Sequence, residues 1–254
     1  MKTKTLLYNG EVELLFDSYR HAYTDSRGKI PSVTTVLGII SKPALTGWAA
    51  RMAVEYIQDI VKPGMQFDEM QLATMFENAK KAHYQKKVDA GQLGSFVHKW
   101  VENYIKGEEQ PIPVHEGIKQ SIKKFLKWVE KHDVKFVLSE QQIYSRKHRY
   151  AGTLDFICKI DGKLYIGDLK TSSGIWDEYK IQTAAYRYAR EEEFPNEKYE
   201  GQLIVRIGKE EGGDLEFAVM RDPVAYKKMV IGFIAAKKLL ETMEEIKKTE
   251  VEKE

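Results

Sequence analysis

The sequence predicts an α/β fold in which a helical lobe precedes a core built around a β-sheet. Three observations predict it. Apolar side chains recur at helical spacing up to residue 132, and from residue 133 on they form segments of strand length. The length of 254 residues also allows a full hydrophobic core without staples. We expect a hairpin and helical lobe at 1–132, packed on a core with a C-terminal helix at 133–254, within a single compact domain.

The N-terminal region is predicted to contain a small hairpin and five helices. Apolar residues alternate loosely at 8–23, and turn-forming residues follow at 25–28. Ser32 is expected to cap a helix at 33–40. The remaining helices of the lobe are expected at residues 44–61, 68–89, 94–105 and 114–132.

The core is predicted to alternate strands with few helices. A helix at 176–193 separates the third strand from the fourth, and Pro223 opens the C-terminal helix. The strands are expected at residues 134–144, 150–160, 163–170, 199–208 and 215–220.

Composition excludes several classes of protein. The single cysteine, Cys158, rules out an intramolecular disulfide, a cysteine-rich zinc site and an iron–sulfur cluster supplied by this chain. The longest apolar run spans only 229–236, whereas roughly 20 residues are needed to cross a bilayer, and no signal peptide is evident. A soluble, cytoplasmic protein without a membrane partner is expected.

The formal net charge of +2 hides an uneven distribution. The stretch 78–106 has six lysines against two acids, and the stretch 119–150 has nine basic residues against three acids. Such stretches are typical of a surface that binds a polyanion, but they also occur on solvated helix faces.

The dipeptide Asp161-Gly162 predicts a two-residue hairpin turn that fixes the register of two strands. In that register Asp155 lies directly opposite Asp168, and two facing carboxylates favour a bridging cation. Lys170 follows two residues after Asp168 and shares its face of the strand. A bulged turn would instead shift the register and separate the two acids.

Three further positions combine with these residues. Glu140 continues the parity of apolar residues in its strand, so we expect an inward carboxylate, which a salt bridge could also explain. His98 lies at the edge of an apolar helix face, where it is a ligand or a packing residue. Gln182 and Tyr186 share a helix face, and one hydrogen bond between them would satisfy both.

Together these motifs resemble the PD-(D/E)xK nuclease superfamily, and in particular its RecB-like exonuclease branch. The segment 31–37 is similar to phage-encoded members and to the mitochondrial genome-maintenance exonuclease. The core motifs, in order, are Gly94-Ser95-Phe96-Val97-His98, Glu140, Tyr150-Ala151-Gly152-Thr153-Leu154-Asp155, Gly167-Asp168-Leu169-Lys170-Thr171-Ser172 and Gln182-Thr183-Ala184-Ala185-Tyr186. The resemblance implies a restriction-endonuclease-like core, with a mixed central sheet flanked by helices.

The resemblance also implies a site. Asp155, Asp168, His98 and the Leu169 carbonyl would hold one or two Mg²⁺ or Mn²⁺ ions. Lys170 would orient or deprotonate the attacking water, and Glu140 would bind metal or position water. The remaining motif residues would contact the DNA backbone or brace the site: Thr171, Ser172, Gln182 and Tyr186.

The predicted function is therefore a metal-dependent DNA exonuclease that acts on single-stranded or frayed ends. It would serve DNA replication, recombination or repair in a bacterial or phage-infected cell, with replication or recombination proteins as further partners. The alternatives are a structure-specific endonuclease of the same fold, an inactive module that binds DNA ends, and an α/β protein whose acids only form surface ion pairs.

Overall fold

The computed structural model describes residues 2–209 and 212–249. The chain divides into two compact units, one formed by Met1–Ile39 with Val97–Glu254 and the other by Ile40–Phe96. The second unit contains α2 (Pro43–Ile60) and the first part of α3 (Glu69–Ile105). Two separate helices at 68–89 and 94–105 were predicted, and this was wrong. The helix runs on through Gly91 and Gly94, because a single glycine costs an interior turn only about 1 kcal/mol.

The N-terminal residues form a four-stranded antiparallel sheet with strands in chain order. The strands are β1 (Lys2–Leu7), β2 (Val12–Asp17), β3 (Ala22–Asp25) and β4 (Gly28–Ile30), with the short helix η1 (Tyr8–Gly10) after β1. The predicted turn at 25–28 is confirmed, and Ser32 caps α1 (Val33–Leu37) by accepting the backbone N–H of Thr35 at 2.9 Å. The sequence pattern missed β1, because its lysines and threonines leave it mostly exposed.

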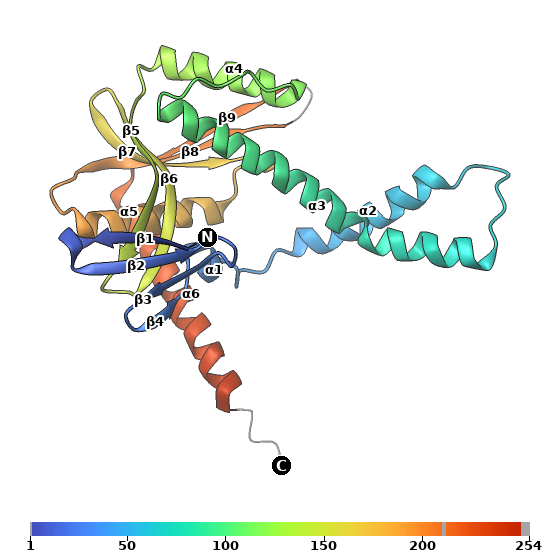
Figure 1. The fold of residues 1–254 in the computed structure, drawn as a ribbon, viewed down its shortest axis with the longest axis horizontal. Coiled ribbons are helices and arrows are strands. Elements are labelled where there is room, and N and C mark those ends of the chain that lie inside the picture. Colours follow the sequence, from blue (N-terminus) through green and yellow to red (C-terminus); the bar gives the residue numbers. More distant parts are fainter. Residues whose placement is uncertain (1, 210–211, 250–254) are drawn as a thin grey trace. The chain divides into compact units, whose positions relative to one another are not determined.

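The core is a mixed five-stranded sheet with strands in chain order (Figure 1). Its strands are β5 (Lys135–Ser145), β6 (Tyr150–Ile160), β7 (Lys163–Lys170), β8 (Tyr199–Ile207) and β9 (Leu215–Met220). Only β7 and β8 run parallel, since α5 (Asp177–Glu193) forms the crossover between them. The five predicted strands and the α/β class are confirmed.

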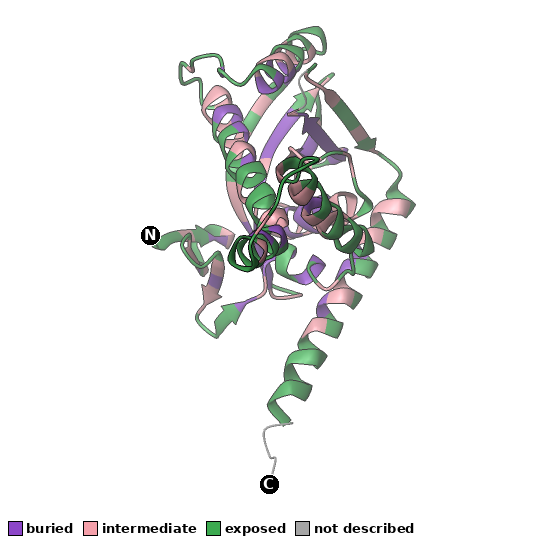
Figure 2. Ribbon diagram, turned by 90° about the vertical axis from the view of Figure 1, so that its right-hand side faces the viewer, coloured by how far each residue is buried: buried purple, intermediate pink, exposed green. Residues whose placement is uncertain are grey.

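Helices cover both faces of this sheet. One hydrophobic cluster joins Ile157 and Ile166 of the sheet to side chains of α1, α5 and α6 (Pro223–Thr249). Phe156 precedes Ile157 and points to the opposite face of the sheet. There its ring contacts the Phe136 ring, with centroids 5.4 Å apart. Phe136 in turn contacts the rings of α4 (Glu116–Lys131) and of the end of α3. The central strands are therefore the most deeply buried part of the larger unit (Figure 2).

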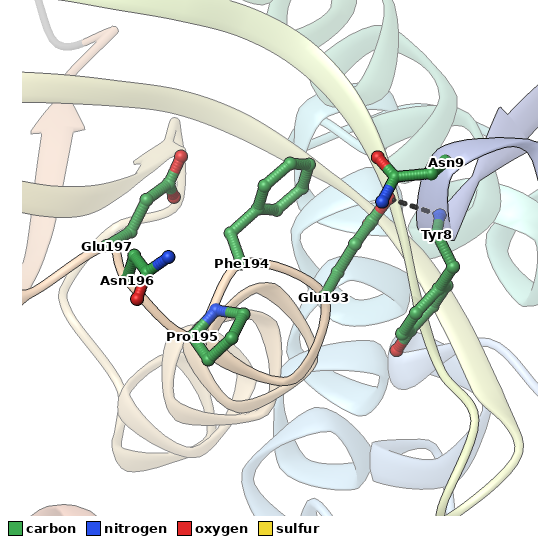
Figure 3. Close-up of a pocket in the computed structure, with 7 residues that line it drawn as sticks. All are labelled: Tyr8, Asn9, Glu193, Phe194, Pro195, Asn196 and Glu197. Atoms are coloured by element: carbon green, nitrogen blue, oxygen red, sulfur yellow. Dashed lines mark hydrogen bonds between the residues drawn. The ribbon is translucent and has the colours of Figure 1, made fainter.

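The N-terminal sheet is attached to the core through Tyr8. Its backbone N–H donates to Glu193 at 2.8 Å, and its hydroxyl group donates to the Tyr144 carbonyl at 2.8 Å and to Glu192 at 3.1 Å. A pocket of about 380 Å³ lies beside this attachment, between η1 and the end of α5 (Figure 3). Tyr8 lines this pocket, and its backbone N–H and hydroxyl groups are both bonded within the protein, so we assign the pocket to the attachment of the sheet.

Candidate active site

The β6–β7 hairpin sets the position of the two central acids. Asp161 and Gly162 both have positive φ, as a two-residue type I′ turn requires. The paired residues run from Ile160 with Lys163 to Phe156 with Gly167, which confirms the predicted register. Continued by one residue, this register sets Asp155 opposite Asp168. The Asp155 carboxylate also accepts the Leu169 backbone N–H at 2.6 Å, which fixes its orientation.

Asp168 and Lys170 form a buried ion pair at the end of β7. Lys170 Nζ lies 2.6 Å from Asp168 Oδ2, and the Asp168 side chain is only 1% exposed. The other oxygen, Asp168 Oδ1, accepts Gln182 Nε2 at 3.0 Å. Gln182 Nε2 also donates to the Tyr186 hydroxyl oxygen at 2.9 Å. Because Gln182 and Tyr186 are buried and bonded inward, their geometry favours the bracing role over contact with nucleic acid.

Three side chains from three elements converge beside this ion pair. His98 of α3, Glu140 of β5 and Asp155 of β6 each offer one ligand atom, and these atoms lie within 4.8 Å of one another. His98 Nδ1 is 3.7 Å from Asp155 Oδ1. All three belong to the larger unit. The structure thus brings together five of the predicted residues: His98, Glu140, Asp155, Asp168 and Lys170.

Glu140 reaches this cluster by a route that parity did not foresee. We expected it to be buried with Phe136 and Leu138, but the residue as a whole is exposed, and only its carboxyl group turns toward His98 and Asp155. The register of β5 against β6 shifts between Phe136 and Leu138, so alternation cannot be carried across that point. Glu140 itself has φ of 51°, a left-handed conformation that is strained for a residue other than glycine. Among the described residues, the nearby Lys99 and Lys106 form their ion pairs with Glu102.

Two glycines of the predicted motifs have a packing reason. A Cβ atom at Gly167 would lie 1.9 Å from the Phe156 ring, and one at Gly152 would lie 2.7 Å from the Tyr186 ring. Only glycine lets these rings close over the strands. The position of the Tyr186 ring matters because its hydroxyl group accepts a hydrogen bond from Gln182, which also donates to Asp168.

Tyr179 contacts the site but was missed in the sequence. Lys170 Nζ lies 4.8 Å from the centroid of its ring, a cation–π contact. Tyr179 is in the first turn of α5, three residues before Gln182 and seven before Tyr186. This spacing places all three residues on one helix face, and it was the signal that could have identified Tyr179.

The carboxyl groups of the site carry more negative charge than their neighbours balance. Burial and the negative charge of Asp155 raise the pKa of Asp168 to about 6. The positive charge of Lys170 acts to lower this pKa but is outweighed. Removal from water and the charge of Asp155 likewise raise the pKa of Glu140 to about 7. Asp155 is also removed from water, but His98, Lys170 and the Leu169 N–H hold its pKa below the usual range. Raised pKa values in adjacent acids indicate a site that a further cation would stabilise.

The remaining predicted residues lie in the loop after Lys170. The Ser172 hydroxyl donates to the Gly174 carbonyl at 2.8 Å, and the Ser172 carbonyl accepts Arg206 Nη1 at 3.1 Å. Thr171 is half-buried beside them. Contacts of Thr171 and Ser172 with nucleic acid, and ligation by the Leu169 carbonyl, stay predictions.

Comparison with solved structures finds distant likenesses. A protein named SSO0001 shares 15% identity at a TM-score of 0.37, over 78% of this chain and 86% of that one. A candidate exonuclease from Eubacterium rectale shares 13% sequence identity at a TM-score of 0.36, over 56% of this chain and 63% of that one. An alkaline exonuclease from Laribacter hongkongensis shares 10% sequence identity at a TM-score of 0.34, over 81% of this chain and 97% of that one.

The chain matches no protein-family profile, and no curated protein matches it in sequence. Among the described residues, no helix is long and apolar enough to cross a membrane. The geometry of the site is therefore the basis on which a function is inferred.

Proposed function

We propose that the protein is a metal-dependent DNA exonuclease that hydrolyses phosphodiester bonds from single-stranded or frayed ends. One observation carries the proposal: His98, Glu140 and Asp155 converge within 4.8 Å beside the buried pair of Asp168 and Lys170. The same residues carry the resemblance to the PD-(D/E)xK nucleases. We place its work in DNA replication, recombination or repair in the cytoplasm of a bacterial or phage-infected cell.

The donor atoms fit a hard divalent cation. Two carboxylates and one imidazole surround the candidate position, and Asp168 lies next to them. Carboxylate oxygens suit Mg²⁺ and Mn²⁺, whereas the described residues offer no thiolate there. His98, Glu140, Asp155 and Asp168 would hold one or two such ions, with the Leu169 carbonyl as a further ligand. A bound ion would supply Lewis-acid polarisation of the phosphodiester and neutralise part of its charge.

The residues of the chain supply orientation and positive charge. In hydrolysis a water oxygen adds to phosphorus, the bond from phosphorus to the leaving oxygen breaks, and that oxygen gains a proton. Lys170 would direct the water and offset the charge that develops on the phosphate oxygens. Its ammonium group is fixed between the Asp168 carboxylate and the Tyr179 ring. Gln182 keeps Asp168 in place, and the Leu169 N–H does the same for Asp155.

The test is digestion of end-labelled single-stranded DNA, end-labelled duplex DNA and covalently closed circular DNA with Mg²⁺ or Mn²⁺. We expect degradation of the linear substrates, no activity with EDTA, and a loss of about 10²-fold to 10³-fold in Lys170→Ala. Lys163→Ala is the matched control, because Lys163 lies on the same strand but is exposed and paired with Glu200. Blocking the 5′ or the 3′ end then gives the polarity.

Each other outcome of this panel decides against the proposal. Rapid cutting of the closed circle would indicate a structure-specific endonuclease. Binding of DNA ends without cleavage would indicate an inactive end-binding module. Equal activity of Lys170→Ala and Lys163→Ala would show that the ion pair with Asp168 has no part in catalysis.

A further inference from the structure

A second candidate binding surface lies at the edge of the core sheet. Strand β9 is one of the two edge strands of this sheet, and two of its apolar side chains are accessible: Phe217 is 37% exposed and Val219 is 40% exposed. Together with α4, β8 and the β6–β7 turn, these residues line a groove of about 560 Å³. We call it the edge groove. None of its lining residues belongs to the candidate active site.

The floor of the edge groove is aromatic and firmly supported. The Trp128 ring of α4 stacks on the Phe217 ring, with centroids 4.7 Å apart and planes 25° apart. Behind it, Trp128 contacts the fully buried Phe125 at 6.1 Å, and His132 lies 6.0 Å from Trp128 on the same helix end. Phe217 therefore remains 37% exposed although Trp128 covers one face of its ring.

The rim of the edge groove is cationic. Lys127 and Lys131 are exposed one helical turn apart on α4, and no described acid forms an ion pair with either. Arg221 completes the cationic rim, and it is held in place because its Nε donates to the Tyr165 hydroxyl oxygen at 3.0 Å. Asp161 is the one acidic residue among the described lining residues. The charge of the groove therefore complements an anion.

We propose that the edge groove binds a single-stranded nucleic acid, with a base on Phe217 and the neighbouring phosphates at Lys127 and Lys131. Proteins bind single strands with this combination of stacking aromatic rings and a cationic path for the backbone. A protein partner fits less well, because protein interfaces are depleted in lysine. The choice of ligand rests on the proposed nuclease function.

The position of the groove gives it a role distinct from catalysis. Asp161 borders the groove and Asp155 lies in the candidate active site, and five residues of β6 lie between them, so the two positions are about 20 Å apart along the strand. A single strand can therefore engage the groove and the active site at once. A strand held in the groove stays with the protein after each cut, so the groove would favour processive degradation.

The test measures binding of a fluorescein-labelled oligothymidylate by anisotropy in EDTA, where no cleavage occurs. Phe217→Ala is expected to weaken binding about fivefold or more, and Phe217→Tyr is expected to restore it. Lys127→Glu combined with Lys131→Glu is expected to weaken binding at least about tenfold. Loss of two phosphate contacts also makes the salt dependence shallower by about 1.4 in the log–log slope.

The matched control is Lys227→Glu combined with Lys228→Glu, which changes the net charge equally at two exposed positions of α6. It should bind like the unmodified protein. Should Phe217→Ala unfold, the Lys127 and Lys131 variant still decides, because both side chains are exposed. The inference is overturned if the groove variants bind normally, if the control weakens binding equally, or if poly-L-glutamate competes as well as the oligothymidylate.

This assay separates the inference from the proposed function. Groove-dependent binding by a protein that cuts no DNA would retain the groove and reject the nuclease. Cutting by a protein whose groove variants bind and degrade processively like the unmodified chain would retain the nuclease and reject the groove.

Discussion

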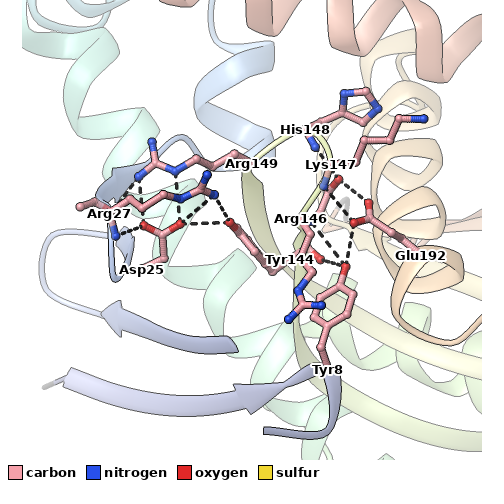
Figure 4. A network of polar contacts seen from close by, with 11 residues as sticks. Tyr8, Asp25, Arg27, Tyr144, Arg146, Lys147, His148, Arg149 and Glu192 are labelled. Carbon is pink, nitrogen blue, oxygen red and sulfur yellow. Dashed lines mark hydrogen bonds and ion pairs between the residues drawn. The ribbon is translucent and has the colours of Figure 1, made fainter. Parts of the chain in front are cut away.

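Among the clusters of charged side chains in the larger unit, two differ clearly in the balance of their charges. In the first, Asp25 accepts two hydrogen bonds from the Arg149 guanidinium, at 3.0 and 3.2 Å, and one from the Tyr144 hydroxyl at 3.0 Å (Figure 4). Its backbone contact is the Arg27 N–H at 2.8 Å. The second cluster is the candidate active site, where Glu140, Asp155 and Asp168 outnumber the cations.

The pKa values of the acids follow this difference. Burial acts to raise the pKa of Asp25, but the hydrogen bonds from Arg149, the Arg27 N–H and Tyr144 outweigh it and lower the pKa to about 2. At the active site the pKa values of Asp168 and Glu140 are raised instead. In a cluster that only stabilises the fold, neighbouring groups neutralise the charge of the acids, whereas in a cation-binding cluster part of the negative charge is left unbalanced until the cation binds. The comparison thus separates a structural network from the proposed binding site within one chain.

The largest expected effect is on stability when a divalent cation is added. Mn²⁺ at 100 times its dissociation constant should stabilise the protein by about 2.7 kcal/mol. For a chain of this size that raises the melting temperature by roughly 5–10 °C. Thermal unfolding with Mn²⁺ and with EDTA measures the shift.

Exchange of one acid in each cluster sharpens this result. Asp155→Asn should abolish the shift, because Asp155 belongs to the proposed ligand set. Asp25→Asn should lower the melting temperature but retain the shift. A shift that survives in Asp155→Asn, or that disappears in Asp25→Asn, would contradict the division into a binding site and a structural network.

The second effect is the acid sensitivity that Asp25 confers. Its pKa falls from 3.8 to about 2 on folding, so its contribution is fully present above about pH 4 and is lost as the pH falls through about 2. The contribution is about 2 kcal/mol, since one pKa unit corresponds to about 1.4 kcal/mol. Urea unfolding of the protein and of Asp25→Asn across this window should give a difference that shrinks toward low pH. A constant difference would show that the charge of Asp25 is not stabilised.

Part of the site could be predicted because it depends on local rules. Asp161-Gly162 fixes the turn, the turn fixes the register, and the register brings Asp155 level with Asp168. The strand bounds 150–160, 163–170 and 215–220 also follow from apolar segments between turn residues, and the structure has these bounds.

Other features could not be predicted because they arise from tertiary packing. Trp128 and Phe217 stack only because α4 packs against the edge strand β9, and the local sequence around either residue does not predict this contact. The single helix α3 has a different reason, because a glycine inside a helix costs only about 1 kcal/mol and does not by itself end the helix. The irregular pairing of β5 likewise changed the environment of Glu140, which alternation had placed in the interior.

The smallest expected effect tests whether Glu140 stores strain at the site. Its φ of 51° costs roughly 1–3 kcal/mol for a residue other than glycine. Glu140→Gly relieves this strain, but glycine loses more conformational entropy on folding, which costs about 0.5–1 kcal/mol. Glu140→Gln keeps the strain and removes only the charge. We expect the glycine variant to be about 1 kcal/mol more stable than the glutamine variant in urea unfolding with EDTA, with nuclease activity reduced in both. A glycine variant less stable than the glutamine variant would mean that the left-handed backbone at residue 140 stores no strain, and that its conformation is set by the packing of β5 alone.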